Sequence, residues 1–169
     1  HHLDNIQIRT GVDIRPGTNC ELLPPIYIGG QGTVGTRTFD GSVTNKELID
    51  SLLAKSEYVF HIAALPRIQP SFDTPIQHEE VNVMGTIRCI EALKGNRRLK
   101  KSVLSSSSSC YGTPSELPTT EQAGIACLSP YALQKYAAEQ HAILLGARFG
   151  IPVIALRYFN VYGPRSFNS

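Results

Sequence analysis

Apolar residues follow helical spacing and then strand spacing in the middle of the chain. Over residues 45–55, Leu48, Leu52 and Leu53 share one helical face, and an asparagine, a residue type that caps helices, begins the segment. The sequence EYVFHIAA follows as a short apolar run rich in strand-forming side chains. Such a run is typical of a strand covered on both faces. The pattern therefore predicts a helix followed by a buried strand.

The same alternation repeats further along the chain. Over residues 82–95, Val83, Ile87 and Ile90 lie on one helical face, and Gly95 ends the segment. The sequence KKSVLSSSS that follows is strand-like. These segments predict a second helix and a second strand.

A long helix and a last strand complete the pattern. Residues 129–150 begin with Ser129 as a cap and Pro130 in the first turn, and Gly150 ends the helix. The sequence IPVIALRYFN then predicts another buried strand. Strands that alternate with helices imply an α/β fold, with a parallel sheet and right-handed crossovers.

Five consecutive serines, residues 105–109, end the second predicted strand. Ligands of parallel sheets bind beyond the carboxyl ends of the strands, and this run lies at that edge. A flexible linker would not sit between a strand and its crossover helix. We therefore interpret the run as a strand end that presents one working hydroxyl.

The segment of residues 11–36 is different because it is rich in Gly, Pro and Thr, and it predicts loop with about two short strands. Gly30, Gly32 and Gly35 match the spacing of a dinucleotide-binding fingerprint. That fingerprint needs a helix to begin within it, whereas the sequence TRTFDG follows and favours a strand. A plain glycine turn is predicted.

Composition narrows the class of protein. The 169 residues are 41% hydrophobic and 18% charged, which indicates one globular domain. With a net charge of +2, the basic stretch NRRLKK is expected to be a solvated helix end and not a nucleic-acid surface. No apolar run is long enough to span a membrane. The four cysteines share no CxxC spacing, so we expect free thiols in a reducing cytoplasm and no metal site.

Tyr131 and Lys135 stand four residues apart on the long predicted helix and share one face. A phenol has an ordinary pKa of about 10, and a nearby ammonium group lowers this pKa by favouring the phenolate. Such pairs also occur on many helices by chance, and Tyr136 could be the buried tyrosine instead. The combination with a serine at a strand end, a Tyr-Gly and a Ser-Pro-Tyr helix start favours a catalytic site.

Five motifs occur in order between residues 40 and 165. Together they resemble the extended short-chain dehydrogenase/reductase family in its NAD-dependent epimerase/dehydratase branch, and within it the enzymes that epimerise UDP-glucose and UDP-N-acetylglucosamine at carbon 4. The resemblance implies a Rossmann-like doubly wound parallel sheet and NAD as the cofactor. Before residue 40 the likeness is carried by LDN alone. The motifs are FHIAALP, VNVMGTIRCIEAL, SSSSSCYG, LSPYALQKYAAEQ and LRYFNVYGPR.

The resemblance implies which residues carry the reaction. Ser107, four residues before the tyrosine of Tyr-Gly, matches the catalytic serine or threonine of the family, and Tyr131 and Lys135 match its tyrosine and lysine. Ser107, Tyr131 and Asn160 match residues that contact the sugar nucleotide. His61 is expected to be a satisfied core histidine. The implied cofactor contacts are Asp4, Asn5, Asp40, Gly41, Ala63, Ala64, Leu65, Asn82, Tyr131, Lys135 and Phe159.

In the implied reaction, Tyr131 as phenolate takes the proton of a sugar 4-hydroxyl, which Ser107 bridges. The hydride at C4 of the sugar passes to NAD. It then returns to the opposite face of the keto-sugar. Related dehydratases and decarboxylases carry acidic residues where this chain has Ser108 and Ser109, which favours 4-epimerisation of a UDP-hexose. A dehydratase or reductase of the same family and a non-catalytic NAD- or nucleotide-binding module are alternatives. A serine hydrolase would need a GxSxG elbow, which the sequence lacks.

The whole chain, residues 1–169, is interpreted as a partial NAD-binding Rossmann domain, with a loop-rich part over residues 1–39 and the core motifs over residues 40–165. The first strand, glycine-rich turn and helix of the family and its C-terminal substrate domain are expected to be absent. The sheet is therefore expected to lack its central strand and to expose an edge. Activity on a UDP-sugar is expected of a longer parent protein, and the resemblance implies a homodimer formed through the two long helices.

Overall fold

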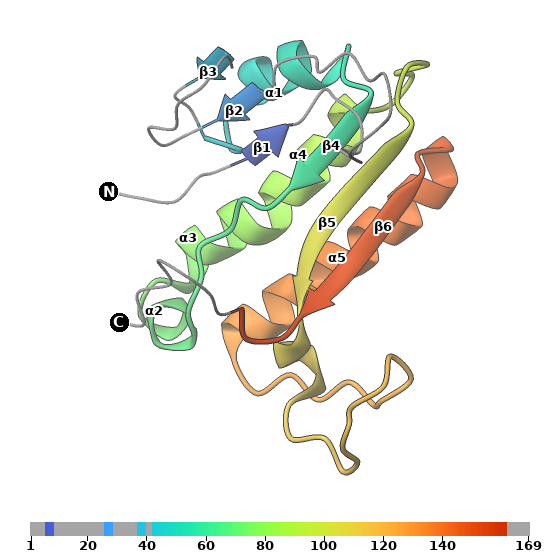
Figure 1. Cartoon of the computed structure of the whole chain (residues 1–169). Helices are drawn as coiled ribbons and strands as arrows, with labels where there is room; N and C mark the ends of the chain where they lie inside the picture. The colour runs from blue at the N-terminus through green and yellow to red at the C-terminus, as the bar shows by residue number, and fades with distance from the viewer. Residues whose placement is uncertain (1–5, 9–25, 29–36, 40–41, 162–169) are drawn as a thin grey trace.

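The computed structural model describes residues 6–8, 26–28, 37–39 and 42–161. These residues form a six-stranded sheet with the order β3-β2-β1-β4-β5-β6 (Figure 1). The strands are β1 (Ile6–Ile8), β2 (Ile26–Ile28), β3 (Arg37–Phe39), β4 (Tyr58–His61), β5 (Lys101–Ser107) and β6 (Val153–Tyr158).

The three strands that the apolar runs predict, β4, β5 and β6, are confirmed and run parallel. β4 pairs with β5 up to His61 opposite Leu104, and β5 pairs with β6 up to Ser107 opposite Tyr158. The carboxyl ends of the three strands therefore share one edge of the sheet. The serine run lies at that edge, as the sequence predicts.

The other half of the sheet differs from a wholly parallel arrangement. β1 runs antiparallel to both of its neighbours, with Gln7 opposite Phe60 of β4, whereas β2 and β3 are parallel. The expected exposed edge is therefore not found beside β4, because β1 pairs with it. An unpaired strand edge leaves backbone N–H and C=O groups without partners, and β1 pairs with this edge of β4 at Gln7 and Phe60. The glycine triplet between β2 and β3 lies outside the described residues.

Three predicted helices are confirmed. The first, α1 (Lys46–Leu53), is capped by the side chain of Asn45, which accepts a hydrogen bond from the Leu48 amide at 3.1 Å. The last, α5 (Pro130–Phe149), starts from the Ser129 cap and ends at Gly150, whose φ of 69° suits a residue without a side chain. The middle helix begins earlier than expected, with a π-helical turn η1 (Glu80–Met84) before α4 (Gly85–Ala92).

Two short helices, α2 (Ile68–Asp73) and α3 (Pro75–Glu79), were not predicted, because neither is long enough to show a helical apolar period. They tie the segment after β4 to the start of α5. The Ser71 hydroxyl donates to the Ile68 carbonyl at 2.6 Å and accepts from the Tyr131 amide at 3.0 Å. The backbone at Tyr131 is thus fixed from the α2 side.

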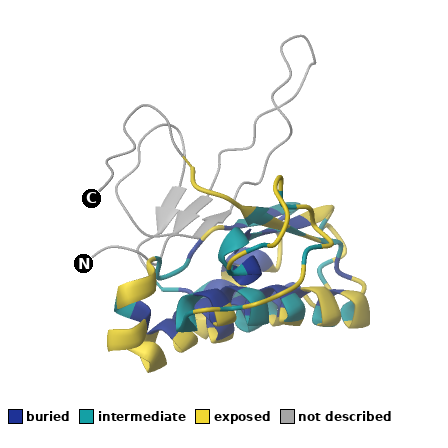
Figure 2. Ribbon diagram, turned by 90° about the horizontal axis from the view of Figure 1, so that it is seen from below, coloured by how far each residue is buried: buried dark blue, intermediate teal, exposed yellow. Residues whose placement is uncertain are grey.

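The helices gather on one side of the sheet, and the core lies between them and the strands (Figure 2). Side chains of a strand point alternately to its two faces, and in β6 the outward set Ile154, Leu156 and Tyr158 is exposed. The expectation that this strand is buried on both faces is therefore wrong, because no helix of the described residues covers its second face. The buried core consists of Val43, Ile49, Leu52, Leu53, Val59, Ala63, Val81, Cys89, Ile90, Leu93, Leu104, Ala142 and Ile151.

Candidate active site

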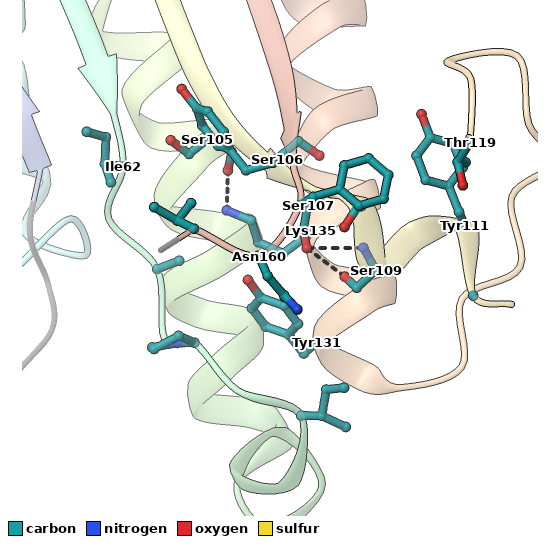
Figure 3. A pocket seen from close by; sticks show the side chains of 18 of the residues that line it. Ile62, Ser105, Ser106, Ser107, Ser109, Tyr111, Thr119, Tyr131, Lys135 and Asn160 are labelled. Atoms are coloured by element: carbon teal, nitrogen blue, oxygen red, sulfur yellow. Dashed lines mark hydrogen bonds between the residues drawn. The ribbon is translucent and has the colours of Figure 1, made fainter. Parts of the chain in front are cut away.

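An open cleft of about 910 Å³ lies at the carboxyl edge of the parallel strands (Figure 3). Its floor is the serine run of β5, and α5 and the segments that follow β4 and β6 form its sides. This is the place where an α/β sheet binds its ligands. The lining includes Ile62, Ala63, Ala64, Pro66, Ser105, Ser106, Ser107, Ser109, Tyr111, Thr119, Tyr131, Lys135, Tyr158, Phe159 and Asn160.

Three side chains of α5, one helical turn apart, meet the end of β5. Lys135 donates from Nζ to the Ser105 carbonyl, and Glu139 accepts from the Ser106 hydroxyl at 2.6 Å. Tyr131 interacts with the side chain of Ser107. Residues four apart share a helix face, so the sequence spacing of these three residues creates the contact. The structure thus brings the predicted Ser107, Tyr131 and Lys135 together at one cleft.

Ser107 is the last residue of β5 and caps the short 3₁₀ turn η2 (Ser108–Tyr111). Its Oγ accepts hydrogen bonds from the Ser109 amide at 3.2 Å and from the Ser109 hydroxyl at 2.9 Å. A hydroxyl has only one proton to donate. Ser107 is the acceptor in both of these contacts, so its own proton remains available. Ser107 can therefore donate into the cleft, toward Tyr131.

The pKa of Tyr131 differs from the expectation that Lys135 lowers it. Burial raises the pKa of this phenol above its ordinary value, and the hydrogen bond with Ser107 works in the opposite direction without reversing the shift. The Lys135 ammonium reaches the Ser105 carbonyl instead of the phenol. In this structure Ser107, and not Lys135, is therefore the neighbour that favours the phenolate.

Lys135 is buried, and burial lowers its pKa to about 8. His61, in β4, is also buried; burial and then the charge of Lys135 lower its pKa to about 3, so the ring is neutral at neutral pH. Its Nε2 lies 2.8 Å from the Thr86 hydroxyl, while Nδ1 has no partner among the described residues. The core position expected for His61 is confirmed, but only one of its nitrogens is satisfied.

The remaining predicted residues divide into two groups. Ala63, Ala64, Phe159 and Asn160 line the cleft with the catalytic candidates. Leu65 packs against the core, and Asp4, Asn5, Asp40 and Gly41 lie outside the described residues.

Asn82 does not line the cleft but holds the segment that does. It is buried in η1, where its Oδ1 accepts from the Leu65 amide at 2.7 Å and its Nδ2 donates to the Leu65 carbonyl at 3.1 Å. These two bonds fix the backbone directly after Ala63 and Ala64. The cofactor contact expected for Asn82 itself stays a prediction.

Ser109, Tyr111 and Thr119 are among the lining residues that the sequence did not single out. Ser109 orients Ser107, and the ring of Tyr111 is stacked near that of Phe159, with centroids 6.5 Å apart. Thr119 reaches the same cleft from the loop before α5. The only signals in the sequence were the length of the serine run and the Tyr-Gly after it, and neither shows which hydroxyl faces which.

A phenol, an alcohol and a buried amine around one cleft form a set that can move a proton to or from a substrate hydroxyl. Comparison with known proteins identifies the family of the chain. Residues 10–169 match the family model described as the NAD dependent epimerase/dehydratase family. The chain belongs to this family.

Relatives of this chain in the family carry names that refer to nucleotide sugars. The UDP-glucose 4-epimerase of Lactobacillus helveticus is 30% identical over 160 residues, which are 92% of this chain and 48% of that protein. The structure of a UDP-N-acetylglucosamine 4-epimerase from Methanobrevibacter ruminantium, in complex with UDP-N-acetylmuramic acid, matches with a TM-score of 0.72 and 32% identity over 77% of this chain and 41% of that one.

A second solved structure includes the cofactor. The UDP-glucuronic acid 4-epimerase of Bacillus cereus, in complex with UDP-glucuronic acid and NAD, matches with a TM-score of 0.71 and 32% identity over 77% of this chain and 41% of that one. The chain spans about half the length of the curated relatives it matches, 48% in the case of the Lactobacillus protein. Within the described residues, no helix combines the length and the apolar character needed to cross a bilayer.

The buried ammonium of Lys135 predicts a pH dependence of stability. Its pKa is about 8 in the folded chain against an ordinary value of 10.5, so between these values the unfolded chain binds a proton that the folded chain has released. The free energy of unfolding of the wild type, compared with that of a Lys135→Met variant, therefore rises with pH through this window, by roughly 1.5 kcal/mol between pH 8 and pH 9.5. Urea titrations at several pH values measure the difference. The difference in unfolding free energy between the wild type and the exposed control Lys55→Met should stay constant with pH, and an equally constant difference between the wild type and Lys135→Met would contradict the assignment.

Proposed function

We propose that the protein that carries this chain catalyses the NAD-dependent 4-epimerisation of a UDP-sugar. The observation that carries the proposal is the meeting of Ser107, Tyr131 and Lys135 at one cleft. The family and the names of the relatives support it, because the relatives described above are UDP-sugar 4-epimerases.

In this proposal Tyr131 removes the proton of the sugar 4-hydroxyl and later returns it, and Ser107 hydrogen-bonds the same oxygen. The raised pKa means that the phenol holds its proton at neutral pH until a favourable charge or hydrogen bond is added. Ser109 keeps Ser107 oriented by donating two hydrogen bonds to its Oγ. When bound, NAD would supply the acceptor and donor of two electrons and a positive nicotinamide ring that favours the phenolate.

The described residues fit the nicotinamide half of this cofactor. Ala63 and Ala64, at the end of β4, present small side chains that allow close approach, and Asn82 holds the loop behind them. An ammonium group has three protons to donate, and the Ser105 carbonyl takes one from Lys135. Lys135 can therefore also hold a ribose hydroxyl. The contacts implied for the adenosine half, at Asp4, Asn5, Asp40 and Gly41, lie outside the described residues and stay predictions.

The chemistry of the lining favours epimerisation over elimination. Among the described residues that line the cleft, none carries a carboxylate, and Ser108 and Ser109 occupy the places where related dehydratases carry acids. Loss of water from a sugar needs a group that can protonate the leaving hydroxyl. The cleft offers hydroxyls and one ammonium, which suit reversible oxidation at a single carbon.

Substitution of Tyr131 tests the proposed base. Tyr131→Phe removes the phenol oxygen that accepts the proton in this proposal and should lower kcat by about 10²- to 10⁴-fold. The assay uses the complete protein that carries this chain, with NAD and UDP-hexoses, and separates the two epimers. Tyr136→Phe, five residues further along the same helix, is the matched control and should leave the rate unchanged. Interconversion by Tyr131→Phe at the wild-type rate would rule out the role of Tyr131.

We further propose that the protein pairs with a second copy through the outer surface of α5 and its neighbours. Leu133 and Leu144, three turns apart on α5, are 58% and 66% exposed, and Ile76 of α3 is 78% exposed. Met84 of η1 adds a fourth exposed apolar side chain. Apolar residues that gather on adjacent helices mark an interaction surface, and two copies of the same surface can form a symmetric helix bundle.

A charge on this surface should separate the copies. Leu133→Glu together with Leu144→Glu should shift a dimer to a monomer in sedimentation velocity, because two copies of each carboxylate would face an apolar interface. The control Ile125→Glu places the same charge on an exposed apolar residue in the loop before α5, and should leave the sedimentation coefficient unchanged. A wild-type protein that sediments as a monomer, or a variant that stays dimeric, would contradict this interface.

A reducing cytoplasmic setting is also proposed. The three described cysteines, Cys89, Cys110 and Cys127, are free thiols, and Cys89 and Cys110 are buried among other side chains. Free buried thiols are typical of proteins kept in a reducing compartment.

A further inference from the structure

A buried ion pair joins α5 to the end of β6, one turn beyond Lys135. Glu139 and Arg157 bind through two parallel contacts, Nη2 to Oε1 at 2.7 Å and Nε to Oε2 at 3.0 Å. The Glu139 side chain is 4% exposed and that of Arg157 is 19% exposed. This two-point geometry is specific to arginine, whose planar fork matches a carboxylate.

Both members of the pair make further contacts at the cleft. Glu139 accepts from the Ser106 hydroxyl at 2.6 Å, directly beside Ser107. Arg157 donates from Nη1 to the Tyr111 hydroxyl at 2.9 Å, and its guanidinium carbon lies 4.9 Å from the centre of the Tyr111 ring. One ion pair thus connects α5, the end of β5, the turn η2 and the end of β6. All four segments contribute residues to the cleft.

We infer that the Glu139–Arg157 pair is a positioning unit, which sets the place of Ser107 and of Tyr158, Phe159 and Asn160 around the cleft. The inference rests on the proposed function, since it assigns a role in the same reaction. Ser106 itself lines the cleft beside Ser107, and Arg157 directly precedes the lining residue Tyr158 in β6, so both arms of the network reach the cleft.

The cost of burying the charges of Glu139 and Arg157 indicates that the pair has a role beyond stabilising the fold. A buried ion pair can often be exchanged for apolar residues of similar size without loss of stability, because desolvation offsets much of the attraction. The other ion pairs among the described residues, Lys46–Asp50 and Lys100–Glu57, are exposed and connect nothing at the cleft. Hydrogen bonds from Arg157 and Ser106 outweigh burial and keep the pKa of Glu139 below its ordinary value, so the pair is charged at neutral pH.

The test compares variants of the pair in the complete protein that carries this chain. Arg157→Lys keeps the charge and loses the two-point contact, and Glu139→Gln keeps the shape and loses the charge. A double variant, Glu139→Gln with Arg157→Met, leaves no unpaired charge and guards against simple failure to fold. The matched control is the exposed pair, as Glu57→Gln with Lys100→Met.

Two readouts separate positioning from stability. The first is kcat for each folded variant, which should fall by about 10- to 100-fold in Arg157→Lys and in the double variant, with a smaller change in KM, because a displacement of about 1 Å at a reacting group has an effect of this size. The second is the pKa of the Tyr131 phenol, followed by NMR of ¹³C-labelled tyrosine and assigned with Tyr131→Phe. This pKa should rise, because a displaced Ser107 no longer donates to the phenol.

The outcomes decide the inference in either direction. Folded variants with the wild-type kcat and an unchanged Tyr131 pKa would overturn it and leave the pair a purely structural contact. Recovery of kcat in the double variant would overturn it as well. If the wild-type protein interconverts no UDP-sugar, the proposed function fails, whereas the shift of the Tyr131 pKa still decides whether the pair positions Ser107. The control pair should change neither readout.

Discussion

The contact between one face of α5 and the end of β5 determines the rest of the site. Tyr131, Lys135 and Glu139 recur at one-turn spacing and meet the side chains or backbone of three successive serines. A buried ammonium and a buried carboxylate are costly unless each is hydrogen-bonded, and the serine backbone and hydroxyls supply those bonds. These polar contacts therefore fix the register of α5 on β5, because a shift of the helix along the strand would leave the buried charges without hydrogen bonds.

The same contact explains the charges around the cleft. Lys135 is buried with a pKa of about 8, and its charge and the surrounding apolar core keep His61 neutral. Tyr131 is partly buried and holds its proton, with Ser107 as the neighbour that favours its loss. In the chain alone, the Tyr131 phenol therefore keeps its proton. It releases this proton only when a bound ligand supplies further charge or hydrogen bonds.

Much of this arrangement could be predicted from local sequence. The cap residues Asn45 and Ser129 and the apolar spacing gave α1 and α5 nearly at their observed bounds, and the serine run placed the site at the correct sheet edge. The spacing of Tyr131 and Lys135 correctly put them on one helical face. These features depend on neighbours within a few residues, which a single sequence contains.

The rest depends on contacts between distant segments. β1 is only three residues long, and its antiparallel pairing with β4 follows from the edge that it meets, not from its own pattern. Ile154 and Leu156 are apolar yet exposed, because the described residues place helices on one face only. The direction in which Lys135 points depends on the Ser105 carbonyl thirty residues away, and the burial that raises the pKa of Tyr131 comes from packing between distant segments.

The most direct measurement is a crystal structure of the complete protein with NAD and a UDP-sugar bound. The account predicts that the 4-hydroxyl oxygen of the sugar lies within hydrogen-bond reach, about 2.6–3.2 Å, of both the Tyr131 and the Ser107 hydroxyl oxygens. A sugar whose carbon 4 lies away from both hydroxyls, or a Tyr131 side chain directed out of the cleft, would contradict it.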